Sequence, residues 1–140
     1  MFRMVEHQAD IAVELAAPNR EAFFRTSLEA LVSILAEGVM PLPLKDESEC
    51  REILRVEGFD DEELLIKLLN EFLFLCQTGK FFPLSVEALV SVGDSCLAAT
   101  IYGFRFRGRP PFIREVKAAT YHCLKIQREP EWFAKVVLDV

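Results

Sequence analysis

The stretch Asp60–Cys76, DDEELLIKLLNEFLFLC, decides much of the fold. Asp60, followed by Glu63 three residues later, is typical of a capped helix start, and Gly79 is typical of a helix end. Between them, apolar residues recur on one broad stripe, as in an amphipathic helix: Leu64, Leu65, Leu68, Leu69, Phe72, Leu75 and Cys76. A helix of this kind is stable when its stripe packs into a core, so the stretch predicts a helix covering a sheet.

The residues before this helix predict three further elements. Ile11, Val13 and Leu15 alternate with smaller or polar residues, which indicates a strand over residues 10–15 with one wet face. Asn19 begins a helical pattern that Gly38 ends, so a helix is expected over 20–37. Residues 40–48 are expected to form a surface connection, and 50–57 a second strand.

The residues after the helix predict two hairpins. The first has strands over 84–92 and 96–106, joined by a turn at 93–95. The second has strands over 117–127 and 132–140, joined by 128–131. The element order is then β-α-β-α-β-β-β-β. This order predicts an α+β fold in which two amphipathic helices cover one face of a largely antiparallel sheet.

Length and composition indicate one domain over residues 1–140. The chain has 140 residues, of which 51% are hydrophobic and 27% charged, and this length can bury a sufficient core without disulfides. Its four cysteines form no C-x-x-C pair, which argues against structural zinc and favours a reducing compartment. Because the chain has no long apolar run and its first ten residues include charged ones, we expect a cytoplasmic protein without a membrane span.

The net charge of −6 argues against autonomous nucleic-acid binding and favours a protein partner or a cation. One local exception is the loop that carries Arg105, Arg107, Arg109 and Arg114. Bidentate arginine contacts could bind phosphate or an acidic partner there, and a solvated loop is the alternative.

Acidic groups stand at both ends of the sequence. The run Glu6–Asp10 opens the first predicted strand, and Asp139 interrupts an apolar final strand. With Val140 last in the sequence, an α-carboxylate lies beside the Asp139 side chain. A hard cation such as calcium or magnesium would relieve their repulsion, whereas a solvated tail needs no ion.

Two further side chains come from the predicted strand that begins at residue 117. His122 and Lys117 point to opposite faces of that strand by its alternation. His122 could act as a general base or a ligand, or as an ordinary half-buried histidine. Cys76 lies in line with the helix stripe and is expected in the core rather than as a nucleophile.

Three of these segments together resemble the archease family. Glu6–Asp10, EHQAD, resembles the archease motif E-H-T-A-D, with Gln8 in place of Thr. Val116–His122, VKAATYH, resembles V-K-A-x-T-Y-H, and Val136–Val140, VVLDV, is similar to the terminal V-x-L/F-D-I/V. The resemblance spans the whole chain, with the motifs in family order.

The resemblance implies an accessory protein rather than an enzyme. Archeases activate the RtcB-type RNA ligase of tRNA splicing, promoting its guanylylation and its multiple turnover. By this resemblance a divalent ion, calcium in the family, is held by Asp10, Asp139 and Val140. The surface that meets the ligase would then include His7, Lys117 and His122.

Two other functions are compatible with the sequence. One is a metal-dependent phosphoester hydrolase, in which Asp10 and Asp139 hold an ion and a histidine positions water. The other is an interaction module that docks through Phe72–Phe82, with Phe81 and Phe82 exposed; the alternative is that this stretch belongs to the core.

Overall fold

The structure is a computed structural model of the chain and describes residues 1–6, 10–39 and 48–140. The expected connection at 40–48 lies almost wholly outside these residues. The helices and strands, in chain order, are β1 Phe2–Glu6, β2 Asp10–Ala17, α1 Arg20–Ala36, β3 Glu49–Glu57, α2 Asp61–Gln77, β4 Phe81–Ser91, β5 Cys96–Arg105, β6 Ala118–Thr120 and β7 Trp132–Asp139.

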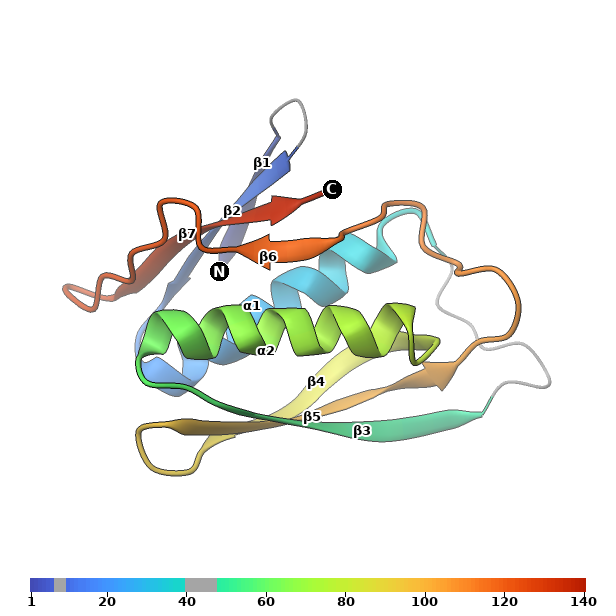
Figure 1. Cartoon of the computed structure of the whole chain (residues 1–140), viewed down its shortest axis with the longest axis horizontal. Helices are drawn as coiled ribbons and strands as arrows, with labels where there is room; N and C mark the ends of the chain where they lie inside the picture. Colours follow the sequence, from blue (N-terminus) through green and yellow to red (C-terminus); the bar gives the residue numbers. More distant parts are fainter. Residues whose placement is uncertain (7–9, 40–47) are drawn as a thin grey trace.

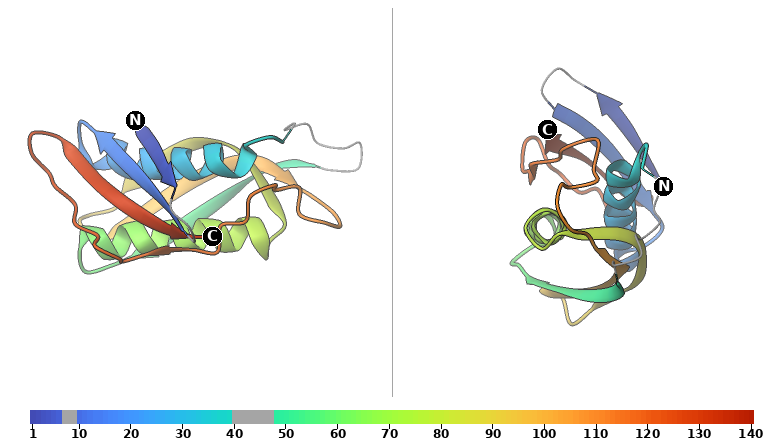
Figure 2. Two further views of the ribbon diagram at one scale, coloured as in Figure 1. Left: turned by 90° about the horizontal axis from the view of Figure 1, so that it is seen from above. Right: turned by 90° about the vertical axis from the view of Figure 1, so that its right-hand side faces the viewer.

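The strands form two antiparallel sheets with the two helices between them (Figures 1 and 2). One sheet has the order β1-β2-β7-β6 and the other β3-β5-β4. Helix α1 contacts β2 and β4, and α2 contacts β6 and β3, so each helix touches both sheets. The predicted α+β class, with two helices on antiparallel strands, is confirmed. The structure adds that the helices are a middle layer, with a sheet on either side.

The composition of α2 explains this middle position. Besides the predicted stripe, Ile66 and Leu73 are also buried, at 4% and 2% exposure. The apolar surface of the helix is therefore wider than one sheet can cover, and the second sheet buries the remainder. The predicted start is confirmed, because the Asp60 carboxylate accepts a hydrogen bond from the Glu63 amide at 2.8 Å.

The first strand, β1, is absent from the predicted order. It pairs with β2 from Phe2 opposite Leu15 to Glu6 opposite Ile11. Phe2 and Met4 pack against the core while the intervening Arg3 pairs with Glu14, so a short alternation marks the strand. Five residues at a sheet edge carry a weak pattern, and edge strands bury only part of their side chains.

The predicted strand over 117–127 is wrong beyond Thr120. The chain turns there, with the Leu124 amide donating to the Tyr121 carbonyl at 2.9 Å and Cys123 in the left-handed region at φ 52°. It meets β7 again only at a single bridge between Gln127 and Phe133. The consequence is that His122 and Cys123 lie on a turn beside the sheet rather than in it.

The docking surface proposed for Phe81 and Phe82 is also wrong, because both side chains are 0% exposed. Phe82 stacks on Phe104 and Phe112, with ring centroids 5.2 and 5.4 Å apart. The alternative interpretation of the stretch, as core, is confirmed. No helix among the described residues is long and apolar enough to cross a bilayer.

Gly103 in the central strand β5 generates a stability prediction. A Cβ atom on Gly103 would lie 2.1 Å from the Phe82 carbonyl oxygen and 2.6 Å from the Phe81 ring. We expect Gly103→Ala to lower the free energy of unfolding by about 3 kcal/mol, because backbone and core must shift. Urea unfolding measures this loss.

Gly93→Ala is the control. The new Cβ meets open space, but the backbone φ of Gly93 is +70°, so we expect the free energy of unfolding to fall by about 1 kcal/mol. Equal losses would contradict the crowding at Gly103.

Candidate functional site

The acidic residues from the two ends of the sequence lie opposite each other in neighbouring strands. In the antiparallel pair of β2 and β7, Asp10 is the register partner of Asp139. Their neighbours Ile11 and Leu138 are buried in the core, at 1% exposure each. Because successive side chains alternate between faces, both aspartates lie on the outer face, turned away from the helices. Directly opposite residues place their Cβ atoms about 5 Å apart.

The third strand at this point is β6. Ala118 is the register partner of Asp139 on its other side, and the Lys117 amide donates to the Asp139 carbonyl at 2.7 Å. Val140 follows Asp139 and packs partly buried against the core. The structure therefore brings four of the predicted residues to one end of the sheet: Asp10, Asp139, Val140 and Lys117.

A pocket of about 360 Å³ opens on the same outer face. Its lining residues are Asp10, Ala12, His122, Cys123, Lys135 and Val137. His122 thus reaches the neighbourhood of Asp10, because the turn after Thr120 folds over the outer face of β7. The remaining predicted residue, His7, lies outside the described residues.

The donor set fits a hard divalent cation. Asp10 and Asp139 supply facing carboxylates, and carboxylate oxygens are the preferred ligands of calcium and magnesium. Within the described ranges no group of three or more His, Cys, Asp and Glu side chains gathers to hold a metal. The predicted third ligand, Val140, follows Asp139 directly in the chain.

Lys135 and Cys123 line the pocket but were absent from the predicted site. Lys135 could have been found, because it lies four residues before Asp139 in one strand and therefore on the same face. Cys123 could not, because its position depends on the turn that ends β6. The exposed thiol and the ammonium are the chemically distinctive additions to the site.

The arginine-rich loop is only partly a free positive surface. Arg105 forms an ion pair with Glu52 and donates to the Gly79 carbonyl, and Arg114 lies 3.6 Å from Glu37. Arg107 and Arg109 are exposed. Half of the predicted positive loop therefore serves the fold.

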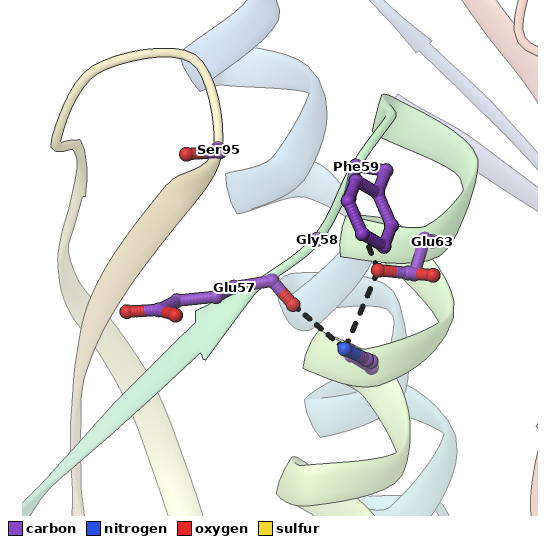
Figure 3. Close-up of a pocket in the computed structure, with 6 residues that line it drawn as sticks. Glu57, Gly58, Phe59, Glu63 and Ser95 are labelled. Atoms are coloured by element: carbon purple, nitrogen blue, oxygen red, sulfur yellow. Dashed lines mark hydrogen bonds and ion pairs between the residues drawn. The ribbon is translucent and has the colours of Figure 1, made fainter.

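A second hollow lies at the start of α2 and is shown in Figure 3. Its polar groups largely bond one another. The Lys67 ammonium donates to the Glu57 carbonyl at 2.9 Å and pairs with Glu63 at 3.3 Å, and Glu63 accepts from the Phe59 amide at 3.0 Å. These contacts stabilise the turn into the helix.

The sequence model of the Archease protein family matches residues 2–140. Protein archease of Pyrococcus furiosus is 32% identical over 142 residues, covering 96% of this chain and 95% of that protein. Protein archease of Archaeoglobus fulgidus is 31% identical, covering 99% and 98%.

Two solved structures are similar over nearly the whole chain. The solution structure of Methanobacterium thermoautotrophicum protein 1598 has a TM-score of 0.68 and 25% identity, covering 99% of this chain and 98% of that one. The crystal structure of an archease, possible chaperone, from Thermotoga maritima has a TM-score of 0.59 and 26% identity, covering 97% and 94%.

The different exposures of Cys123 and Cys76 predict different reactivities with a thiol reagent. Cys123 is exposed, whereas Cys76 is fully buried and burial raises the pKa of its thiol. Because the thiolate is the reactive form, we expect Cys123 to react fastest with a thiol reagent in the native protein and Cys76 to react only on unfolding. Mass spectrometry of the labelled peptides identifies each site. Equal labelling of both residues under native conditions would contradict this packing.

The facing aspartates predict a like-charge penalty. Like charges directly opposite in antiparallel strands destabilise the pair. In a chelator, Asp139→Asn is therefore expected to raise the free energy of unfolding by about 0.5 kcal/mol. Thermal unfolding measures the change, and Asp94→Asn, at the exposed β4–β5 turn, is the matched control. If the two variants gave the same change, the two carboxylates would not repel each other across the strands.

Proposed function

This chain belongs to the archease family, and from that membership we propose that it is an accessory protein that activates an RtcB-type RNA ligase. It promotes guanylylation and multiple turnover of the ligase in tRNA splicing, and acts in the cytoplasm. In this proposal the chain performs no catalysis of its own. The Thermotoga maritima relative is described as a possible chaperone, and assistance to another protein is a role of that kind.

The observation that carries the proposal is the register of β2 and β7, which sets Asp10 opposite Asp139 on the outer face of the sheet. Two carboxylates held together by strand pairing repel each other unless a cation lies between them. We propose that a divalent ion, calcium, is held by Asp10, Asp139 and Val140. When bound, the ion supplies a positive charge that attracts phosphate or carboxylate oxygens of a partner.

The residues around this pair form the proposed contact surface for the ligase. The backbone of Lys117 is held by its amide hydrogen bond to the Asp139 carbonyl, and His122 lines the same pocket as Asp10. His7 belongs to the same sequence motif as Asp10 and is included by that motif alone. Because these groups combine a carboxylate pair with donors of hydrogen bonds, they suit a partner pocket that itself carries metal and phosphate.

One observation favours hydrolysis of phosphoesters as a second candidate. His122 and Asp10 line the same pocket, and a histidine beside a cation is the arrangement that activates water in metal-dependent hydrolases. Release of nitrophenol from p-nitrophenyl phosphate by the isolated protein, lost in Asp139→Ala, would support this candidate. No release with calcium, magnesium or manganese present would remove it.

Ligation by an RtcB-type ligase from the same source tests the proposal. With GTP and manganese present, the wild-type protein is expected to convert a single turnover into many and to increase the ligase–guanylate adduct. Asp139→Ala is expected to lose most of this stimulation, because one of the two facing carboxylates is removed. Product RNA and the guanylated ligase are measured on gels.

Asp94→Ala is the control variant, since it removes a carboxylate at the β4–β5 turn, away from β2 and β7. It is expected to stimulate as the wild type does. Absence of stimulation by the folded wild type would overturn the ligase role. Full stimulation by Asp139→Ala would keep that role and overturn the acidic site as its basis.

A further inference from the structure

Two side-chain amides on α2 hold the segment that leads into β6. Asn70 Oδ1 accepts from the Ala119 amide at 2.8 Å, and Asn70 Nδ2 donates to the Ala119 carbonyl at 3.1 Å. Gln77 Nε2 donates to the Val116 carbonyl. Residues seven apart share one helix face, so both amides reach out from the same side of α2.

The Asn70 contacts take the place of a missing strand. β6 is an edge strand that pairs only with β7, so one edge of its backbone has no strand neighbour. Ala119 is nevertheless buried, with 4% of its surface exposed. Buried backbone amides and carbonyls need hydrogen-bond partners. Asn70 supplies one donor and one acceptor to the same residue, as a neighbouring strand would.

The other edge of the segment bonds to β7 beside the acidic pair. The Lys117 amide donates to the Asp139 carbonyl at 2.7 Å, and Thr120 Oγ1 donates to the Val137 carbonyl at 3.0 Å. The segment from Val116 to Thr120 therefore spans the distance between α2 and β7 with hydrogen bonds on both sides. Its two α2 contacts lie on either side of Lys117 in the sequence.

Loss of the Asn70 amide would leave the amide and carbonyl of Ala119 without partners. An unsatisfied buried polar group is costly, so the segment would move until water reached it. Such a movement changes the position of Lys117 directly. It also changes the carbonyl of Asp139, and with it the end of β7 that opposes Asp10.

We infer that Asn70 and Gln77 are positioning residues of the acidic site, holding Lys117 and the Asp139 end of β7 in place from α2. The inference rests on the proposed function for its activity readout and on the cation site for its affinity readout. The two amides touch neither the ion nor the ligase in this scheme; they act through the Val116–Thr120 segment.

Asn70→Leu and Gln77→Met remove the amides while keeping side chains of similar size. We expect amide hydrogen exchange at Ala119 in Asn70→Leu to accelerate about tenfold or more, because its partner is lost. Calcium affinity, measured by titration calorimetry with calcium chloride, is expected to fall about tenfold, as for other outer contacts of metal sites. Stimulation of the ligase at limiting calcium falls with it, and saturating calcium restores it.

Asn19→Ala is the matched control. It removes the side chain that accepts from the Ala22 amide at 2.9 Å at the start of α1, and so destabilises the fold at a place that β6 does not touch. It is expected to lower Tm as Asn70→Leu does and to leave calcium affinity unchanged. This comparison separates positioning from general stability.

Faster exchange at Ala119 with wild-type calcium affinity and wild-type stimulation would overturn the inference. If Asn70→Leu does not fold, Gln77→Met, at an exposed position, decides by the same readouts. A wild type that binds calcium without activating the ligase would end the proposed function, while affinity still decides the positioning role. A wild type that does neither would overturn both.

Discussion

The helix layer lies between two sheets, and this constraint shapes the rest of the molecule. Each helix must present apolar surface on two sides, which leaves little room for polar groups in the middle layer. Asn70 on α2 is a polar residue in this layer. Its side-chain amide donates to the Ala119 carbonyl and accepts from the Ala119 amide, so both of its polar groups bond to β6. Such a residue is tolerated because it is fully bonded, and it then fixes one geometry for β6. The outer faces of the sheets are free of this restriction, and the facing aspartates occupy one of them.

Much of the secondary structure could be predicted because the signals are local. The cap at Asp60 and the stripe that follows it define α2 without reference to other elements. The division into two sheets could not be predicted in the same way, since it depends on how wide the buried surface of the helices is. Phe82 shows the same limit: its sequence neighbourhood fits an exposed patch or a core, and only the stacking of Phe104 and Phe112 on it decides. The short β6 depends on where Thr120 and the turn after it meet β7, which is also non-local.

The candidate site also combines residues that could be predicted from the sequence with residues whose position depends on non-local packing. The family resemblance assigned Asp10 and Asp139 to one ion site, which requires the first and last predicted strands to be neighbours, and the register places the two residues opposite each other. Their role as ion ligands stays a prediction. The amides of α2 were missed, because Asn70 is followed by Glu71 and its partner Ala119 is far away in the sequence. Cys123 carried no local signal, because nothing in its neighbours indicates a left-handed backbone.

The register of β2 against β7 also has a consequence for how the protein folds. The two strands are separated by most of the chain, so their pairing closes a very long loop, and such contacts form late and slowly. In the unfolded chain the two carboxylates are far apart and form no joint binding site. A ligand that needs both carboxylates therefore binds only chains in which β2 and β7 are paired, and it stabilises that state by mass action. Occupancy of the site would then report that β2 and β7, which come from opposite ends of the sequence, have paired in the four-stranded sheet.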